Sequence, residues 1–227
     1  LGLFDDPFRR IDPRREKTRI RTRESLALAR EAGAKSIVML KNDGSLLPLP
    51  RQGKRIALIG PFAAGQHDLI GPWNVYGTDA EAVDLATGVR ATVADPSLVS
   101  VSLGSGIDEP LAGGIPAAVA AARAADIVVL AIGESQRMSG EAQSRVDIVV
   151  PAAQMALVEA VAVTGTPIVV LLRTGRALAL HGDDETEMPR ITSRGRSRLC
   201  SFARALILRR VPAFSDETMR HDTGPKV

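Results

Sequence analysis

Four short apolar segments stand out from the polar positions around them and predict the strands of a sheet. They span residues 55–60, 98–103, 126–133 and 167–172. Three of them are nearly continuous runs of Ile, Val, Leu and Ala, which is typical of strands buried on both faces. Residues 98–103 instead alternate apolar and polar side chains, as expected of a strand with one buried face.

Segments rich in Ala and Leu lie between these runs and predict helices. One covers residues 25–32, continues towards Leu40 and ends in the turn-forming run 42–45, while others cover 115–125 and 152–163. Pro151 suits the first position of the last helix, where its missing N–H is not needed. The pattern also indicates a short helix around 79–87 and a short strand at 177–180.

Strands that alternate with helices form right-handed parallel crossovers, so the order along the chain predicts the fold class. We expect an α/β domain with a mostly parallel sheet flanked by helices on both faces, covering residues 23–180. Residues 1–22 are charged and interrupted by prolines, which favours a linker or lead-in. Residues 181–227 have no long periodic pattern, and their one apolar run, Leu206–Leu208, cannot be assigned to the sheet from sequence.

Composition and charge exclude several classes of function. The net charge is +3, but residues 1–23 carry +4, residues 181–227 carry +2, and the predicted folded body between them carries −3. A mildly acidic body with 3% aromatic residues argues against a nucleic-acid partner. No apolar run is long enough to span a membrane. The three histidines lie far apart, so no metal site is expected. With a single cysteine the chain cannot form an internal disulfide. No phosphate-loop pattern is present, so a nucleotide cofactor is not indicated.

The polar loop 134–150 follows the most strongly predicted strand, where reactive loops of parallel sheets lie. It contains two candidate general acids, Glu134 and Glu141, together with Arg145 and Asp147. The alternative interpretation is an ordinary solvated loop. Trp73, in a glycine-rich loop, could stack on a sugar ring or anchor its loop to the core.

Several segments of the chain resemble glycoside hydrolase family 3. Residues 36–49, SIVMLKNDGSLLPL, resemble the motif that opens the second domain of that family, and residues 1–8 resemble the end of its preceding barrel. Residues 125–134 and 139–145 resemble the strand and the loop that carry the family's acid/base glutamate. The resemblance covers about residues 1–180.

This resemblance implies a retaining hydrolase that removes β-linked glucose or xylose from glycosides. It assigns the acid/base role to Glu141, with Glu134 as the fallback, and supporting roles in substrate binding or loop orientation to Arg145, Asp147 and Trp73. The family's nucleophile is an aspartate of the barrel, so the barrel is the expected partner, and we predict negligible activity for the 227-residue chain by itself. The resemblance implies neither a metal nor a cofactor, and family members occur in periplasmic, secreted and cytoplasmic forms.

Residues 181–227 depart from the family pattern, which predicts a frameshift or truncation near residue 180 and a sheet that is incomplete at its C-terminal edge. Two other interpretations remain open at this point. One is a non-catalytic α/β module that binds carbohydrate or packs on a barrel. The other is a nucleotide- or flavin-binding domain, which rests on sheet topology alone.

Overall fold

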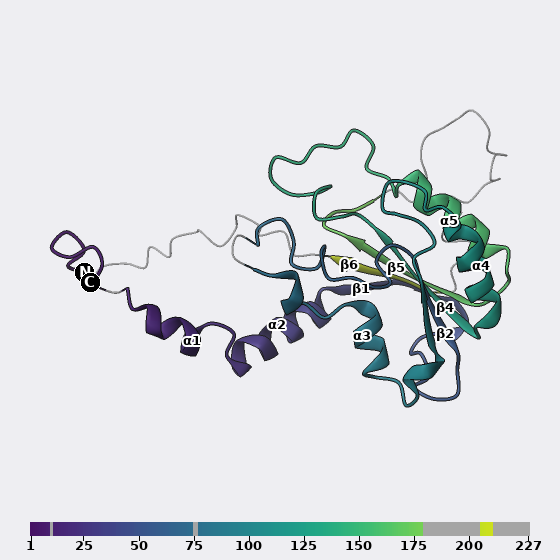
Figure 1. Cartoon of the computed structure of the whole chain (residues 1–227), viewed down its shortest axis with the longest axis horizontal. Helices are drawn as coiled ribbons and strands as arrows, with labels where there is room; N and C mark the ends of the chain where they lie inside the picture. The colour runs from purple at the N-terminus through teal and green to yellow at the C-terminus, as the bar shows by residue number, and fades with distance from the viewer. Residues whose placement is uncertain (10, 75–76, 179–204, 211–227) are drawn as a thin grey trace, which may run out of the picture. The chain divides into compact units, whose positions relative to one another are not determined.

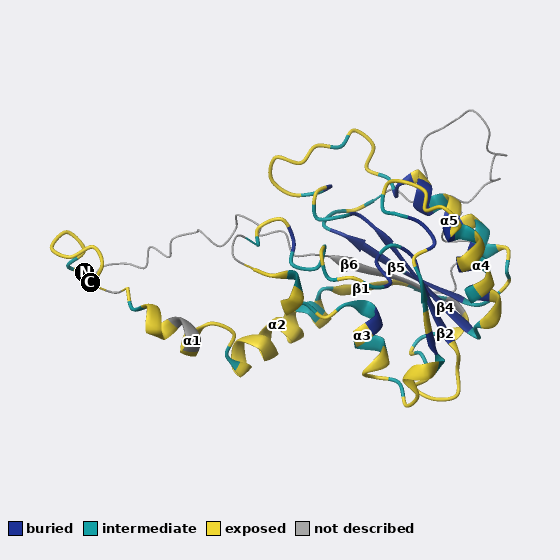
Figure 2. Cartoon of the chain, viewed as in Figure 1, coloured by how far each residue is buried: buried dark blue, intermediate teal, exposed yellow. Residues whose placement is uncertain are grey.

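The computed structural model describes residues 1–9, 11–74, 77–178 and 205–210, and the chain separates into two compact units, residues 1–37 and 38–227 (Figure 1). The first unit is helical, with η1 (Pro13–Arg15), α1 (Glu16–Arg19) and α2 (Arg23–Lys35). Thr22 caps α2, because its hydroxyl oxygen accepts the Ser25 N–H at 3.2 Å. None of the side chains of α2 is buried (Figure 2).

The second unit is built around a sheet. Its strands are β1 (Ile37–Asn42, which starts at the border between the units), β2 (Ile56–Ile59), β3 (Val99–Ser102), β4 (Ile127–Gly133), β5 (Ile168–Thr174) and β6 (Ala205–Arg210). Its helices are η2 (Asp43–Ser45), η3 (Asp79–Glu81), α3 (Leu85–Arg90), η4 (Pro96–Leu98), α4 (Gly114–Ala124) and α5 (Ala152–Ala162).

The strands follow the order β1-β6-β5-β4-β2-β3, counted over the described residues. Every neighbouring pair from β3 to β6 is parallel, and Ile56 of β2 lies opposite both Val99 and Ile127. The predicted α/β class with a mostly parallel sheet flanked by helices is therefore confirmed. Because the strands are parallel, the loops after β2, β4 and β5 leave the sheet at the same edge.

Alternating side chains of the central strands fill two cores, one on each face of the sheet. On one face, residues such as Ile59, Leu130 and Val170 pack with Ala118 of α4 and Leu157 of α5. On the other face the core contains Ile56, Leu58, Val129 and Val169, together with Ala86 of α3. All residues of β2 and β4 are buried (Figure 2), which explains why these strands appear in the sequence as continuous apolar runs.

Three sequence-based expectations about local structure need correction. The first predicted helix does not continue to Leu40: it ends at Lys35, and residues 37–42 form β1 instead. The β-branched pair Ile37-Val38 suits a strand, and the sheet supplies a neighbour for it in β6. Pro151 is the cap that precedes α5 rather than its first residue. In place of one short helix around 79–87, the chain forms η3 and α3.

The C-terminal segments were the least predictable part. Residues 177–178 are not in a strand, and the rest of the short strand expected at 177–180 lies outside the described residues. Residues 205–210, which contain the unassigned apolar run, form β6 and pair with β5 from Val169 opposite Ala205 to Thr174 opposite Arg210. The expected frameshift and the expected incompleteness of the C-terminal edge stay predictions. No helix in the described part of the chain is long and apolar enough to cross a membrane.

Candidate active site

The loop that joins β4 to α5 begins where the ends of β4 and β5 approach closely. Gly133 has a φ of +137°, and a Cβ at this position would overlap the carbonyl of Arg173. Only glycine fits such a position. The next residue, Glu134, donates its N–H to the Arg173 carbonyl at 2.9 Å, so its backbone is fixed to the end of β5.

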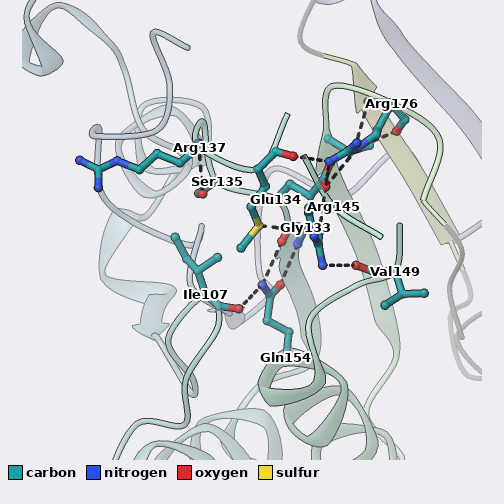
Figure 3. A network of polar contacts seen from close by, with 11 residues as sticks. Ile107, Gly133, Glu134, Ser135, Arg137, Arg145, Val149, Gln154 and Arg176 are labelled. Atoms are coloured by element: carbon teal, nitrogen blue, oxygen red, sulfur yellow. Dashed lines mark hydrogen bonds and ion pairs between the residues drawn. The ribbon is translucent and has the colours of Figure 1, made fainter. Parts of the chain in front are cut away.

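The Glu134 side chain is buried among cationic and hydroxyl donors (Figure 3), with only 1% of it exposed. Arg145 donates from Nη1 to Oε1 at 2.8 Å, and Arg176 donates from Nη2 to the same oxygen at 2.9 Å. Arg176 also donates from Nε to Oε2 at 3.3 Å, and the Thr174 hydroxyl donates to Oε2 at 2.9 Å. Both carboxylate oxygens are therefore occupied, as a buried carboxylate requires.

The same two arginines also hold the backbone of the loop. Arg145 donates from Nη2 to the carbonyl of Val149 at 3.2 Å (Figure 3), and its Nη1 lies 3.8 Å from the sulfur of Met138. Arg176 donates from Nη2 to the carbonyl of Met138. The start, middle and end of the loop thus converge on one carboxylate.

A second buried side chain, that of Gln154, binds the backbone at the C-terminal end of β4. Gln154, on α5, is fully buried and accepts the Gly133 N–H at its Oε1 at 2.8 Å. Its Nε2 donates to the Gly133 carbonyl at 2.9 Å and to the Ile107 carbonyl at 2.7 Å (Figure 3). This amide connects the residue before Glu134 to the loop after β3. Both N–H groups of Nε2 donate and Oε1 accepts one hydrogen bond, so only one acceptor position of the amide is left.

Glu134 also borders a cleft at the carboxyl edge of the sheet. The loops after β2, β4 and β5 all contribute to the lining, which consists of Asp68, Gly71, Pro72, Glu134, Ser135, Gln136, Ser139, Arg173, Thr174 and Gly175. Asp68 accepts the Gln136 N–H at 2.8 Å and so joins two of these loops. The guanidinium of Arg173 stacks on Phe62, 4.9 Å from the ring centre, which fixes one wall of the cleft.

The residues singled out from the sequence occupy different positions around this cleft. Glu134 and Arg145 meet in the buried cluster, whereas Glu141 and Asp147 are exposed on the loop. Trp73 is 68% exposed and follows Pro72 of the cleft lining. Gly140 packs on Pro72, since a Cβ on this glycine would lie 3.0 Å from the Pro72 Cγ, so the segment with Glu141 adjoins the loop with Trp73.

Among the residues without a role assigned from the sequence are the three whose side chains bind Glu134 or Gly133: Thr174, Arg176 and Gln154. The first two follow a predicted strand at its carboxyl end, and the rule that such ends share one edge could have indicated them. Gln154 is an amide inside an otherwise apolar helix segment, which is a weaker signal of a buried polar contact. Among the described residues, no group of three or more His, Cys, Asp or Glu side chains could hold a metal ion.

A family model decides how this arrangement is classified. The model described as "Glycosyl hydrolase family 3 C-terminal domain" matches residues 37–192, which is more than half of the chain. The chain belongs to glycoside hydrolase family 3. The resemblance seen in the sequence motifs is thus confirmed, and the matched residues include strands β1 to β5, helices α3 to α5 and the loop with Glu134 and Glu141.

Similar proteins of this family include both glucosidases and xylosidases. A periplasmic β-glucosidase of Salmonella typhimurium is 34% identical over 82% of this chain and 27% of its own length. A β-xylosidase of Formosa agariphila is 36% identical over 80% of this chain and 25% of its own length. The crystal structure of a β-glucosidase from Listeria innocua in complex with glucose superposes with a TM-score of 0.77 and 35% identity, covering 93% of this chain and 26% of that one. The chain therefore spans about a quarter of the length of these family 3 relatives.

Proposed function

We propose that this chain supplies the acid/base loop of a retaining, exo-acting β-glycosidase, with Glu141 as the acid/base. Family 3 membership gives the class of reaction, hydrolysis of an O-glycosidic bond, and the glucosidase and xylosidase relatives favour a β-glucoside or β-xyloside as the substrate. The fold supports this assignment because the loop follows the carboxyl end of a central parallel strand.

The observation that favours Glu141 over Glu134 is the difference in their surroundings. A general acid must reach the leaving oxygen of the substrate and deliver a proton there. Both oxygens of Glu134 already accept hydrogen bonds from Arg145, Arg176 or Thr174 in a buried cluster. Glu141 is exposed on the same loop and is free to face a substrate brought by another domain.

The proposed reaction has two steps. In the first, the Glu141 carboxyl donates its proton to the glycosidic oxygen while the C1–O bond breaks and the barrel aspartate bonds to C1. In the second, the Glu141 carboxylate takes a proton from water while the water oxygen bonds to C1 and the aspartate leaves. The two carboxyl groups must then lie about 5–5.5 Å apart in the assembled enzyme.

Because the matched residues correspond to the C-terminal domain, we propose that the 227-residue chain assayed by itself has negligible activity. The nucleophile is assigned to the barrel by the family resemblance, and removing a catalytic nucleophile typically lowers the rate by several orders of magnitude. Incubating the purified chain with aryl β-glucoside and aryl β-xyloside tests this, and strong turnover would contradict it.

The role of Glu141 is tested by fusing a family 3 barrel ahead of residue 1 and comparing wild type with Glu141→Gln. With a poor leaving group such as an alkyl alcohol, we expect kcat to fall by about 10²–10⁴-fold, because proton donation is lost. A dinitrophenyl glycoside needs little acid assistance, so its loss should be smaller, and added azide should restore turnover by replacing the base-activated water. Glu109→Gln, at an exposed carboxylate of the loop after β3 to which no role is assigned, is the matched control.

The competing possibility is a non-catalytic module that binds carbohydrate or packs on the barrel. Its support is that Glu141 does not contribute to the cleft lining, which includes Glu134 instead. It predicts equal rates for wild type and Glu141→Gln in the fusion at every leaving group. Equal rates would therefore refute the acid/base role.

A further inference from the structure

The loop after β4 begins at the buried carboxylate of Glu134, and later residues of the loop contact this carboxylate or the arginines that bind it. Glu134 stands at the start of the loop, and the residues that bind it or its partners recur at Met138, Arg145 and Val149. Residues 139–144 are the part of the loop between two of these attachments. Glu141, the proposed acid/base, lies inside this short segment.

The conformation of the segment itself shows how it depends on its ends. It turns back on itself, with the Gln143 N–H donating to the Gly140 carbonyl at 3.3 Å. Gly140 and Ala142 both have positive φ values, +124° and +58°. An alanine at positive φ is unfavourable by itself and persists only where the surrounding contacts hold it. On either side of this turn, the flanking residues are held in place, Met138 by burial and Arg145 by its ion pair with Glu134.

We propose that Glu134 is a positioning residue for the glycosidase reaction: it binds Arg145 and Arg176 and thereby fixes both ends of the segment that carries Glu141. Arg145 connects Glu134 directly to the C-terminal end of the segment. Arg176 connects it to the carbonyl of Met138, just before the N-terminal end, from the residues that follow β5. This inference rests on the proposed acid/base role of Glu141.

The charge arrangement explains why neutralising Glu134 should free the loop. The Arg145 and Arg176 side chains are 20% and 29% exposed, and one carboxylate compensates both of them. A neutral amide at position 134 would leave two partly buried guanidinium groups without an anion. Moving Arg145 outward into water is then the least costly response, and it carries residues 139–144 with it.

The first test needs no activity and uses the 227-residue chain. Trypsin cleaves after arginine, and the loop contains Arg137, which is exposed, and Arg145, which is held by Glu134. In wild type we expect slow cleavage after Arg145 relative to Arg137, measured by mass spectrometry. In Glu134→Gln we expect cleavage after Arg145 to accelerate at least tenfold, while circular dichroism shows that the sheet and its helices remain folded. Unchanged cleavage after Arg145 in a folded variant would overturn the positioning role and leave the role of Glu141 intact.

Arg145→Lys is the second variant, in case Glu134→Gln does not fold. Lysine keeps the charge but cannot bind the carboxylate and the Val149 carbonyl together with a planar fork. Trypsin also cleaves after lysine, so the same assay applies, and we expect faster cleavage at position 145 with a protected core. Asp126→Asn, which removes an ion pair at the opposite end of β4, should not change cleavage in the loop.

The second test uses the fusion with a family 3 barrel. Misplacement of a catalytic group by about 1 Å costs on the order of 10²-fold in rate, so we expect Glu134→Gln to lower kcat about 10–100-fold with little change in KM. Azide should not restore its activity, because the Glu141 carboxylate is still present, whereas azide should restore Glu141→Gln. Azide rescue of Glu134→Gln without rescue of Glu141→Gln would make Glu134 the acid/base and would overturn both proposals.

Discussion

The two ends of β4 carry ion pairs of almost equal length in very different surroundings. At the amino end, Arg55 binds Asp126 at 2.9 Å, with 58% and 33% of the two side chains exposed. At the carboxyl end, Arg145 binds Glu134 at 2.8 Å, with 20% and 1% exposed. Distance alone would rank the two pairs equally. Burial separates them, because water screens the first pair and leaves the second dependent on its protein partners.

The largest effect should come from removing the buried charge. We expect Glu134→Gln to lower the free energy of unfolding by about 3 kcal/mol, because breaking a buried ion pair leaves uncompensated charge. Urea unfolding monitored by circular dichroism measures this, with Asp126→Asn as the control at the other end of the strand. Equal destabilisation by the two variants would abolish the contrast between the ends of β4.

The second largest effect should come from removing the neutral buried amide of Gln154 at the carboxyl end of β4. Gln154→Leu preserves much of the side-chain volume but leaves the Gly133 N–H and the Gly133 and Ile107 carbonyls without this partner. We expect a loss of about 1–3 kcal/mol in urea unfolding, since buried polar groups without partners are costly. Ala156→Leu, which adds leucine at an exposed position of α5, should change stability little.

A third carboxylate, Asp84, is partly exposed but is still expected to stabilise the fold, because it accepts hydrogen bonds from backbone N–H groups. Asp84 caps α3 by accepting the Thr87 N–H at 2.8 Å, and it also accepts the Gly65 N–H at 2.9 Å. Hydrogen bonds from Thr87 and Gly65 lower the pKa of its carboxyl below 3.8. We expect Asp84→Ala to cost about 1 kcal/mol in thermal or urea unfolding, and Asp84→Asn, which retains a capping oxygen, to cost less.

The smallest effect should be that of the exposed pair, and it should depend on pH. The hydrogen bond from Arg55 lowers the pKa of Asp126 from 3.8 to about 2. A carboxyl whose pKa is lower in the folded state stabilises the fold fully above its unfolded pKa and loses this contribution as the pH falls towards 2. The stability difference between wild type and Asp126→Asn should therefore be constant at pH 5–7 and shrink between pH 4 and 2.

Salt gives an independent measurement of the same pair. Ions screen exposed charges, so the difference between wild type and Asp126→Asn at neutral pH should also decrease in high salt. A stability difference between wild type and Asp126→Asn that grew as the pH fell from 4 to 2, or that did not decrease in high salt, would contradict the assignment of Arg55 as the stabilising partner.

The elements with local signals were predictable from the sequence. The continuous apolar runs located β2, β4 and β5, and Ala-rich segments located α4 and α5, because burial on both faces and helix propensity are written into consecutive residues. β1 was mistaken for the end of a helix. Its neighbour in the sheet, β6, comes from residues 205–210, and a pairing over that separation leaves no trace in the local pattern.

The candidate site likewise has features that the sequence predicted and features that only the fold revealed. The sequence by itself determined the loop, its two glutamates and the family motif around them, because these are contiguous residues. Only the tertiary structure decided that Glu134 is buried and Glu141 exposed, since the burial of Glu134 depends on Arg176, which is 42 residues away along the chain. Side-chain solvation and charge compensation are properties of groups that meet in space, and the fold brings them together only when β4 and β5 lie side by side.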